Sequence, residues 1–184
     1  MRQMWQLWQG QISAKSCNDM IYDLRQLSPV QAQTFNQSGD LEENQHRSSI
    51  VRWVEDPQIK DMLWWYAQEA NRLAFGLDVE KVGSVQFTEY SASQAAHYDW
   101  HHDVHWLADM AYDRKISVVL QLSDPSTYEG GDFEFGEVQS PDLNRLKTKG
   151  SILCFPSVLE HRVTPVTKGT RYSLVSWFEG PRWR

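Results

Sequence analysis

The sequence has few cysteines, no long apolar run and no excess of basic residues. Its two cysteines, Cys17 and Cys154, lie far apart among apolar neighbours, so a disulfide framework is not expected. No stretch approaches the roughly 18 consecutive apolar residues of a membrane-spanning helix. The first residues lack the apolar run and small-residue cleavage site of a signal peptide. These absences predict a cytoplasmic protein without a membrane partner.

Charge and tryptophan content narrow the functional classes further. The 18 Lys and Arg residues are outnumbered by 24 Asp and Glu, and no basic cluster interrupts the net charge of −6. Binding to nucleic acid normally needs a basic surface, so no nucleic-acid partner is expected. Nine Trp is a high number for 184 residues. Because a buried indole needs a partner for its N–H, several are predicted to line a cleft or rim, with a Trp-rich core as the alternative.

The length suits a single domain over residues 1–184, whose pattern changes near residue 82. Before residue 82 the apolar spacing is helical. One helix is predicted through Cys17, Ile21, Leu24 and Leu27 and ends at Ser28-Pro29. Residues 31–50 are polar and are predicted to form a loop.

A second helix has clearer boundaries. Asp56 is a good N-cap residue and Pro57 suits the first helical position, while Gly76 closes the segment. One apolar stripe runs along the helix and comprises Ile59, Leu63, Tyr66, Ala70 and Leu73. Residues 1–82 are therefore predicted to be a helical N-terminal support.

After residue 82, short alternating segments and turn residues predict β-strands. The predicted strands cover residues 85–90, 116–122, 133–135, 152–155, 161–166 and 170–178, the last two flanking a turn at Lys168-Gly169. No helical crossovers separate them, which argues against a parallel sheet. The expected fold is mainly β with supporting α-helices, and a closed or jelly-roll barrel fits best.

Four of the six histidines lie between His97 and His105. Residues i and i+2 of a strand share a face, so a His-x-Asp pair offers one imidazole and one carboxylate to one ion. Two such pairs occur here, His97/Asp99 and His101/Asp103, and His161 is the only histidine further along the chain. Two His and one carboxylate are typical of Fe(II) oxygenases. The alternative is a solvated polar strand end.

The strand after the Lys168-Gly169 turn has an unusual face. Arg171, Ser173, Val175 and Trp177 share it, so a cation and an indole stand at opposite ends with small side chains between them. Such a slot suits a small dicarboxylate, since a guanidinium can pair both oxygens of a carboxylate. A hairpin that pairs residue 161 near 175 would place Arg171 within reach of the metal. The alternative for Arg171 is a surface salt bridge.

These segments resemble a known family over residues 83–181. Tyr90, HYDWHHD, EGGDFEF and LEHRVTPVTKGTRYSLVSWFEGP are similar to motifs of the prolyl 4-hydroxylase type of 2-oxoglutarate/Fe(II) oxygenase, especially its bacterial branch named for prolyl and lysyl hydroxylation. The resemblance implies a double-stranded β-helix core. It implies that His101, Asp103 and His161 bind Fe(2+), the first two being selected by the preceding Tyr98. Arg171 and Tyr90 would then bind 2-oxoglutarate.

The same resemblance implies the activity: hydroxylation of a prolyl residue in a peptide or protein with O2, and with ascorbate as a candidate reductant. Tyr98, Trp177, Trp100 and Trp106 are candidates for contacting substrate, as is Arg114, where relatives use an Arg. Lysyl residues or a free amino acid are alternative substrates, and a non-catalytic binding module is an alternative function. An oxygenase that repairs nucleic-acid bases is disfavoured, because that class normally has a second Arg six residues after the first and this chain has Trp177 there. A cupin-like isomerase is disfavoured because only two His ligands are clear. The oligomeric state is not predicted.

Overall fold

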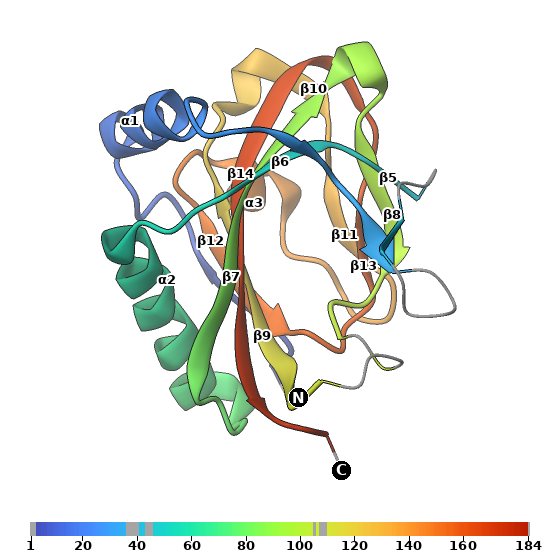
Figure 1. Ribbon diagram of the computed structural model, residues 1–184. Helices are drawn as coiled ribbons and strands as arrows, with labels where there is room; N and C mark the ends of the chain where they lie inside the picture. Colours follow the sequence, from blue (N-terminus) through green and yellow to red (C-terminus); the bar gives the residue numbers. More distant parts are fainter. Residues whose placement is uncertain (1–2, 36–40, 43–45, 105, 107–109, 184) are drawn as a thin grey trace.

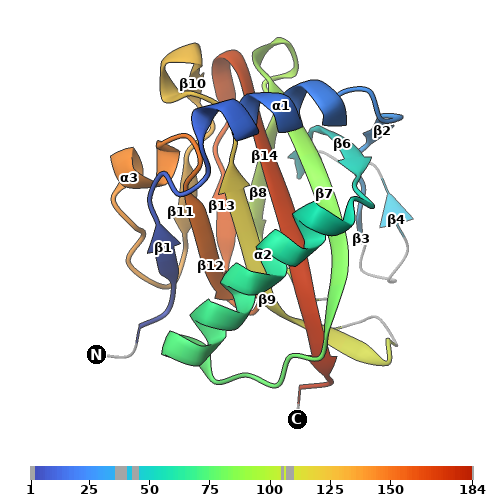
Figure 2. The ribbon, with the colours of Figure 1, turned by 90° about the vertical axis from the view of Figure 1, so that its left-hand side faces the viewer.

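The computed structural model describes residues 3–35, 41–42, 46–104, 106 and 110–183, and it is built on two antiparallel sheets. Figures 1 and 2 show helices α1 (Ala14–Leu24) and α2 (Pro57–Ala70) lying across one face of the larger sheet, with the smaller sheet on the other side. A short third helix, α3 (Leu143–Lys147), precedes β12. The mainly β prediction with supporting helices is therefore confirmed.

The strands of the larger sheet follow an order that is far from their order in the chain: β1 (Gln6–Trp8), β12 (Ile152–Pro156), β9 (Tyr112–Gln121), β14 (Val166–Pro181), β7 (Lys81–Ser91), β6 (Ile50–Trp53) and β2 (Val30–Gln31), with β10 (Tyr128–Gly130) also paired to β14. The smaller sheet has the order β11 (Phe133–Phe135), β13 (His161–Val163), β8 (His97–His101) and β5 (Arg47–Ser48). A separate pair joins β3 (Thr34–Phe35) to β4 (Leu41–Glu42). Connections that cross between two sheets are typical of jelly rolls.

The long strand β14 separates two apolar layers by simple alternation. Leu174 and Phe178 face the helices, where they pack with Phe87 and Leu63. Val175 faces the smaller sheet and packs in a second cluster with the aromatic and aliphatic residues of β11, β12 and β13. A strand with both faces covered in this way holds its inward-facing polar residues in a fixed place between the sheets.

Helix α2 begins as predicted and ends differently. The Asp56 carboxylate accepts hydrogen bonds from the backbone N–H of Gln58 (2.8 Å) and Ile59 (3.1 Å), which caps the helix. After Ala70 the chain continues as a π-helical turn, Asn71–Phe75, and Gly76 adopts a left-handed conformation with φ +63°. The wider turn rotates the following side chains, so Leu73 is 51% exposed. Placing Leu73 on the buried stripe was wrong.

The N-terminal region departs from the sequence prediction in two other places. Helix α1 stops at Leu24, and Leu27 lies beyond it and is exposed. Within the predicted loop 31–50, strands β3, β4 and β5 form, while residues 36–40 and 43–45 lie outside the described part. Strands β1, β2 and β6 also extend the larger sheet, so the region before residue 82 supplies sheet edges as well as helices.

The predicted hairpin between residues 161–166 and 170–178 is wrong. Strand β13 pairs with β11 and β8, whereas β14 pairs with β7, β9 and β10. The chain crosses from the smaller to the larger sheet between them, and the turn at Gly169 faces Tyr128 of β10. Residues 161 and 171 therefore stand on opposing sheets, with the space between the sheets available to a ligand.

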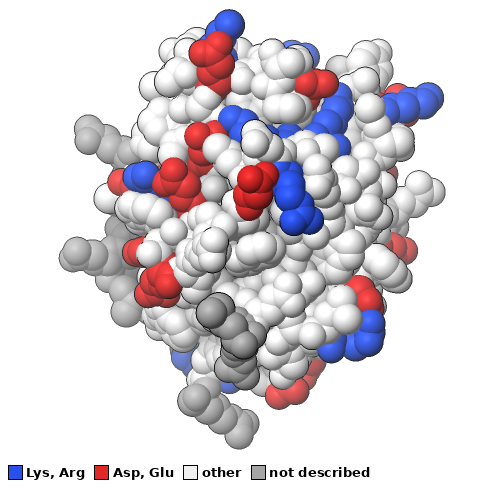
Figure 3. All heavy atoms as spheres, turned by 180° about the vertical axis from the view of Figure 1, so that it is seen from behind, with Lys and Arg blue, Asp and Glu red and all other residues white. Residues whose placement is uncertain are grey.

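Charged side chains of both signs are mixed on the face of the molecule drawn in Figure 3. On the face drawn in Figure 3, Lys and Arg side chains lie among Asp and Glu and form no continuous basic area. Ion pairs such as Arg162–Glu134 (2.7 Å) and Lys147–Asp132 (2.8 Å) join opposite charges. Among the described residues, no helix has the length and apolar character that crossing a membrane requires.

Candidate metal centre

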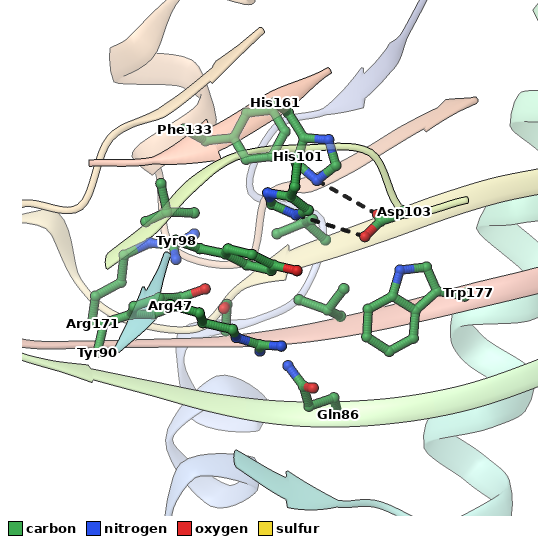
Figure 4. Close-up of a pocket in the computed structure, with 14 residues that line it drawn as sticks. Arg47, Gln86, Tyr90, Tyr98, His101, Asp103, Phe133, His161, Arg171 and Trp177 are labelled. Carbon is green, nitrogen blue, oxygen red and sulfur yellow. Dashed lines mark ion pairs between the residues drawn. The ribbon is translucent and has the colours of Figure 1, made fainter. Parts of the chain in front are cut away.

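Three side chains predicted to bind metal converge between the sheets (Figure 4). His101 ends β8 and His161 begins β13, and the two residues are paired across the smaller sheet. The His101 Nε2 atom lies 3.8 Å from Asp103 Oδ1, and His161 Nε2 lies 3.5 Å from Asp103 Oδ2. All three ligand atoms lie within 4.8 Å of one another. One ion could contact all three.

Backbone carbonyls orient both imidazoles. His101 Nδ1 lies 2.7 Å from the carbonyl oxygen of Asp99, and His161 Nδ1 lies 2.9 Å from that of Leu159. Since a carbonyl oxygen only accepts, each Nδ1 carries a proton, and Nε2 is the ring atom directed at the other two ligands. Burial, followed by the neighbouring His161, holds the pKa of His101 well below its usual value. A neutral ring with a free Nε2 is the form that binds a metal.

Asp103 is held as a carboxylate although it is buried. Burial alone would raise its pKa, but electrostatic interactions with His161, His101 and Arg114 and a hydrogen bond from Ser117 together lower that pKa to about 2. Ser117 Oγ donates to Asp103 Oδ2 over 2.6 Å. Asp103 lies beyond the end of β8, and its backbone N–H donates to Ser157 O (3.0 Å). Two imidazole Nε2 atoms and one oriented carboxylate form a donor set that fits Fe(II).

The other His-x-Asp pair does not join this cluster. His97 Nδ1 lies 3.0 Å from Ala95 O, and Asp99 is exposed. The register between β13 and β8 shifts between the pairs His161–His101 and Val163–Tyr98, which is a β-bulge. A bulge breaks the alternation of side chains, so Tyr98 and His101 face the same side. Their rings stack with centroids 3.4 Å apart.

A pocket runs from these three residues to Arg171. The face predicted from the sequence lines it, since Arg171, Ser173, Val175 and Trp177 all border the cavity. Arg171 is 4% exposed, and its Nε donates to Gln121 Oε1 over 3.1 Å. Because Nε is engaged, the two terminal nitrogens are the ones that can pair a carboxylate. This end of the pocket fits the remote carboxylate of a small diacid.

Neighbouring residues support Arg171. Tyr90 pairs with it in the register of β7 and β14, and the Tyr90 ring centroid is 5.5 Å from the guanidinium carbon. Gln121 in turn donates through Nε2 to the Tyr128 hydroxyl (3.0 Å). At Gly131, whose φ is +61°, an added Cβ would lie 3.0 Å from Arg171 Cδ. The Gly130-Gly131 turn of the EGGDFEF segment therefore leaves room for the arginine.

Two buried polar atoms on the pocket wall lack a hydrogen-bond partner among the described residues. These are Ser173 Oγ and Trp177 Nε1. An unpaired buried donor costs about 1–3 kcal/mol. Polar acceptors of a bound ligand would remove that cost at both positions.

Some of the substrate residues predicted from the sequence line the pocket, and others lie outside it. Tyr98 lines the pocket, and burial raises its pKa to about 12. The Arg114 guanidinium covers the Trp177 ring at 3.8 Å, behind the described pocket wall. Trp100 directly precedes the inward-facing His101 in β8, so it faces outward next to Arg162 and borders a separate surface groove with Phe135. Trp106 is 57% exposed. Neither Trp100 nor Trp106 is among the described residues that line the pocket.

Sequence reasoning missed Arg47 and Gln86, which also line the pocket. Gln86 is opposite Val175 in the pairing of β7 with β14, and alternation along β7 was the signal that could have placed it. Arg47 lies on the two-residue strand β5 and pairs with Tyr98. No local pattern in the polar segment around residue 47 indicates that position.

Comparison with known proteins agrees with this geometry. A family model described as the 2OG-Fe(II) oxygenase superfamily matches residues 85–179, which is about half of the chain and includes the metal cluster and Arg171. The chain belongs to this superfamily, whose cofactors are iron and 2-oxoglutarate.

Individual relatives indicate which branch of the superfamily the chain is similar to. A PKHD-type hydroxylase of Gloeothece citriformis is 28% identical over 148 residues, covering 80% of this chain and 62% of that protein. A PKHD-type hydroxylase of Hyphomonas neptunium is 41% identical over 64 residues, which cover 35% of this chain and 28% of its own length. The chain thus spans less than two thirds of the relatives that it matches.

Solved structures share the fold. A prolyl-4-hydroxylase of Pseudomonas putida has a TM-score of 0.66 at 20% identity, covering 97% of this chain and 93% of that one. A viral collagen prolyl hydroxylase from Paramecium Bursaria Chlorella virus-1 has a TM-score of 0.65 at 16% identity, covering 97% of both chains. These likenesses confirm the double-stranded β-helix expected from the sequence.

Proposed function

We propose that this chain is an Fe(II)- and 2-oxoglutarate-dependent hydroxylase that acts on a prolyl residue of a peptide or protein. The observation that carries the proposal is one pocket with a His101–Asp103–His161 donor set on one side and the buried Arg171 guanidinium at the other. Three protein ligands would leave coordination positions of the metal open, and Arg171 would hold the far end of a diacid in the same pocket.

In this proposal each group has a defined task. His101, Asp103 and His161 hold the ion through Nε2, a carboxylate oxygen and Nε2. Arg171, with Tyr90 beside it, pairs with the carboxylate of 2-oxoglutarate remote from the metal. When bound, iron and 2-oxoglutarate supply the oxidising power that inserts an oxygen atom from O2 into a C–H bond, with release of succinate and CO2. Val119, Val163 and Phe133 line the pocket and limit the access of water.

The choice of a prolyl substrate rests on similarity and on the shape of the pocket. The similar solved structures include prolyl hydroxylases, one from Trichoplax adhaerens in complex with a hypoxia inducible factor oxygen degradation domain peptide fragment, at a TM-score of 0.68. In this chain the pocket ends at the Trp177 ring and is flanked by the Tyr98 ring. Flat aromatic faces suit a proline ring. Arg114 would act from behind Trp177, by orienting its ring.

The test is succinate release from 2-oxoglutarate with Fe(II) and ascorbate, measured with and without Pro-containing peptides, and mass spectrometry for a peptide that gains one oxygen atom. We expect peptide-stimulated succinate release and an oxygenated prolyl residue. His161→Ala is the control for metal-dependent turnover. Oxygenation of lysyl peptides or a free amino acid instead would overturn the prolyl assignment, and no Fe(II)-dependent decarboxylation would favour a binding module.

A further inference from the structure

Arg47 places a second buried guanidinium in the pocket, apart from Arg171. Its side chain is 8% exposed and lines the same cavity. Nε donates to Ser49 Oγ over 3.2 Å, and the guanidinium carbon lies 4.5 Å from the Tyr98 ring centroid. No ion pair of Arg47 occurs within the described ranges. A buried charge is costly without an anion, so this position is suited to receiving one.

The position of Arg47 separates it from the site proposed for 2-oxoglutarate. Figure 4 shows Tyr98 between His101 and Arg47, and the Arg47 guanidinium points toward Gln86 on the Trp177 side of the pocket. Arg171 occupies the other end in the same view. Trp177 also borders the pocket, and its unpaired ring nitrogen lies on the side of Asp103 (Figure 4). Arg47 and Gln86 therefore border the part of the pocket that 2-oxoglutarate would leave open.

Formal charges point the same way, if the proposed function is correct. The two positive charges of Fe(II) and that of Arg171 are opposed by Asp103 and by the two carboxylates of 2-oxoglutarate, so this group is neutral. Among the described residues that line the pocket, Arg47 then remains as a cation without an opposing charge.

We propose that Arg47 binds a carboxylate of the substrate, so that the enzyme prefers an acid over the matching neutral amide. This inference rests on the proposed function and specifies its substrate class. Two sources supply the same chemistry: the carboxylate of the reacting prolyl residue where it ends a chain, or an acidic side chain next to it in a peptide. A planar guanidinium pairs both carboxylate oxygens, whereas a neutral amide offers one weaker acceptor.

The test measures binding rather than turnover. Fe(II) and 2-oxoglutarate are bound under anaerobic conditions, and the visible absorbance of their chelate shows that the pocket is intact. Two matched pairs of probes are then titrated by calorimetry: N-acetylproline against N-acetylprolinamide, and acetyl-Pro-Asp-amide against acetyl-Pro-Asn-amide. We expect one acid to bind at least about tenfold more tightly than its neutral partner. Saturating 2-oxoglutarate keeps the probes away from Arg171.

Variants assign the preference to Arg47. Arg47→Gln should abolish the preference for the acid, and Arg47→Lys, which keeps the charge, should retain part of it. Arg145→Gln is the matched control, since Arg145 lies on α3 and bonds to Gln9 at the surface, and it should keep the full preference. Preference within the first pair indicates a free carboxylate, and preference within the second an acidic peptide. Equal binding within both pairs in the wild-type protein overturns the inference, whether or not Arg47→Gln folds.

The outcomes also separate this inference from the proposed function. In one outcome an acid binds more tightly than its amide, but no prolyl probe is oxygenated once O2 is admitted. That outcome would reject proline as the target and keep Arg47 as an anion site. Oxygenated N-acetylprolinamide with equal binding of acid and amide would keep the prolyl hydroxylase and reject the role of Arg47.

Discussion

Removing the Arg171 guanidinium should weaken 2-oxoglutarate binding by about two orders of magnitude. Arg171 is buried, and its Nε is fixed by Gln121, so a carboxylate on its terminal nitrogens is shielded from water. Truncating one partner of a buried, hydrogen-bonded charge pair costs about 2–5 kcal/mol. Taking about 3 kcal/mol, Arg171→Ala should raise the dissociation constant roughly 150-fold. The contact exists before and during the reaction, so the Michaelis constant should rise more than kcat falls.

The assay for Arg171→Ala is succinate formation at varied 2-oxoglutarate, together with direct binding to the Fe(II)-loaded protein without O2. Arg145→Ala serves as the matched control because Arg145 lies outside the pocket. A change of less than about threefold in both constants would refute the anchor role. A change confined to the peptide substrate would place Arg171 in a different site.

Three further perturbations test separate parts of the structure. Ser117→Ala removes the hydrogen bond to Asp103 and should weaken Fe(II) binding by roughly tenfold in an anaerobic titration. Ser126→Ala, at an exposed serine, is the control and should leave the affinity unchanged. Equal Fe(II) affinities of the Ser117→Ala variant and the wild-type protein would reject this orienting role. A chelator should abolish turnover that Fe(II) restores and Zn(II) does not, and full activity after metal removal would contradict an iron requirement. Leu63→Ala should destabilise the fold by about 2–5 kcal/mol in thermal or denaturant unfolding while leaving the 2-oxoglutarate Michaelis constant of the folded protein unchanged. An unchanged melting temperature would show that α2 is not essential to the core.

Local chemistry made parts of the fold predictable. Helix α2 begins at Asp56 and Pro57 because a capping carboxylate and a proline are both favoured there by backbone geometry alone. The inward face of Arg171, Ser173 and Trp177 follows from the two-residue period of a strand, and the pocket lining confirms it. In both cases the information lies within a few residues of the element concerned.

Predictions that depended on sheet membership failed. The hairpin between residues 161 and 175 was wrong because β13 and β14 belong to different sheets, which no short pattern reveals. Arg47 was missed because it reaches the pocket only through the pairing of β5 with β8. Such positions are set by long-range pairing and not by local preference.

The most direct test of the account is a crystal structure of the protein grown without O2 in the presence of Fe(II) and 2-oxoglutarate, with the metal located by anomalous scattering. The account predicts one ion bound by His101 Nε2, an Asp103 oxygen and His161 Nε2, and a diacid whose far carboxylate contacts Arg171. A metal held by other residues, or a diacid that leaves Arg171 without a carboxylate, would contradict it.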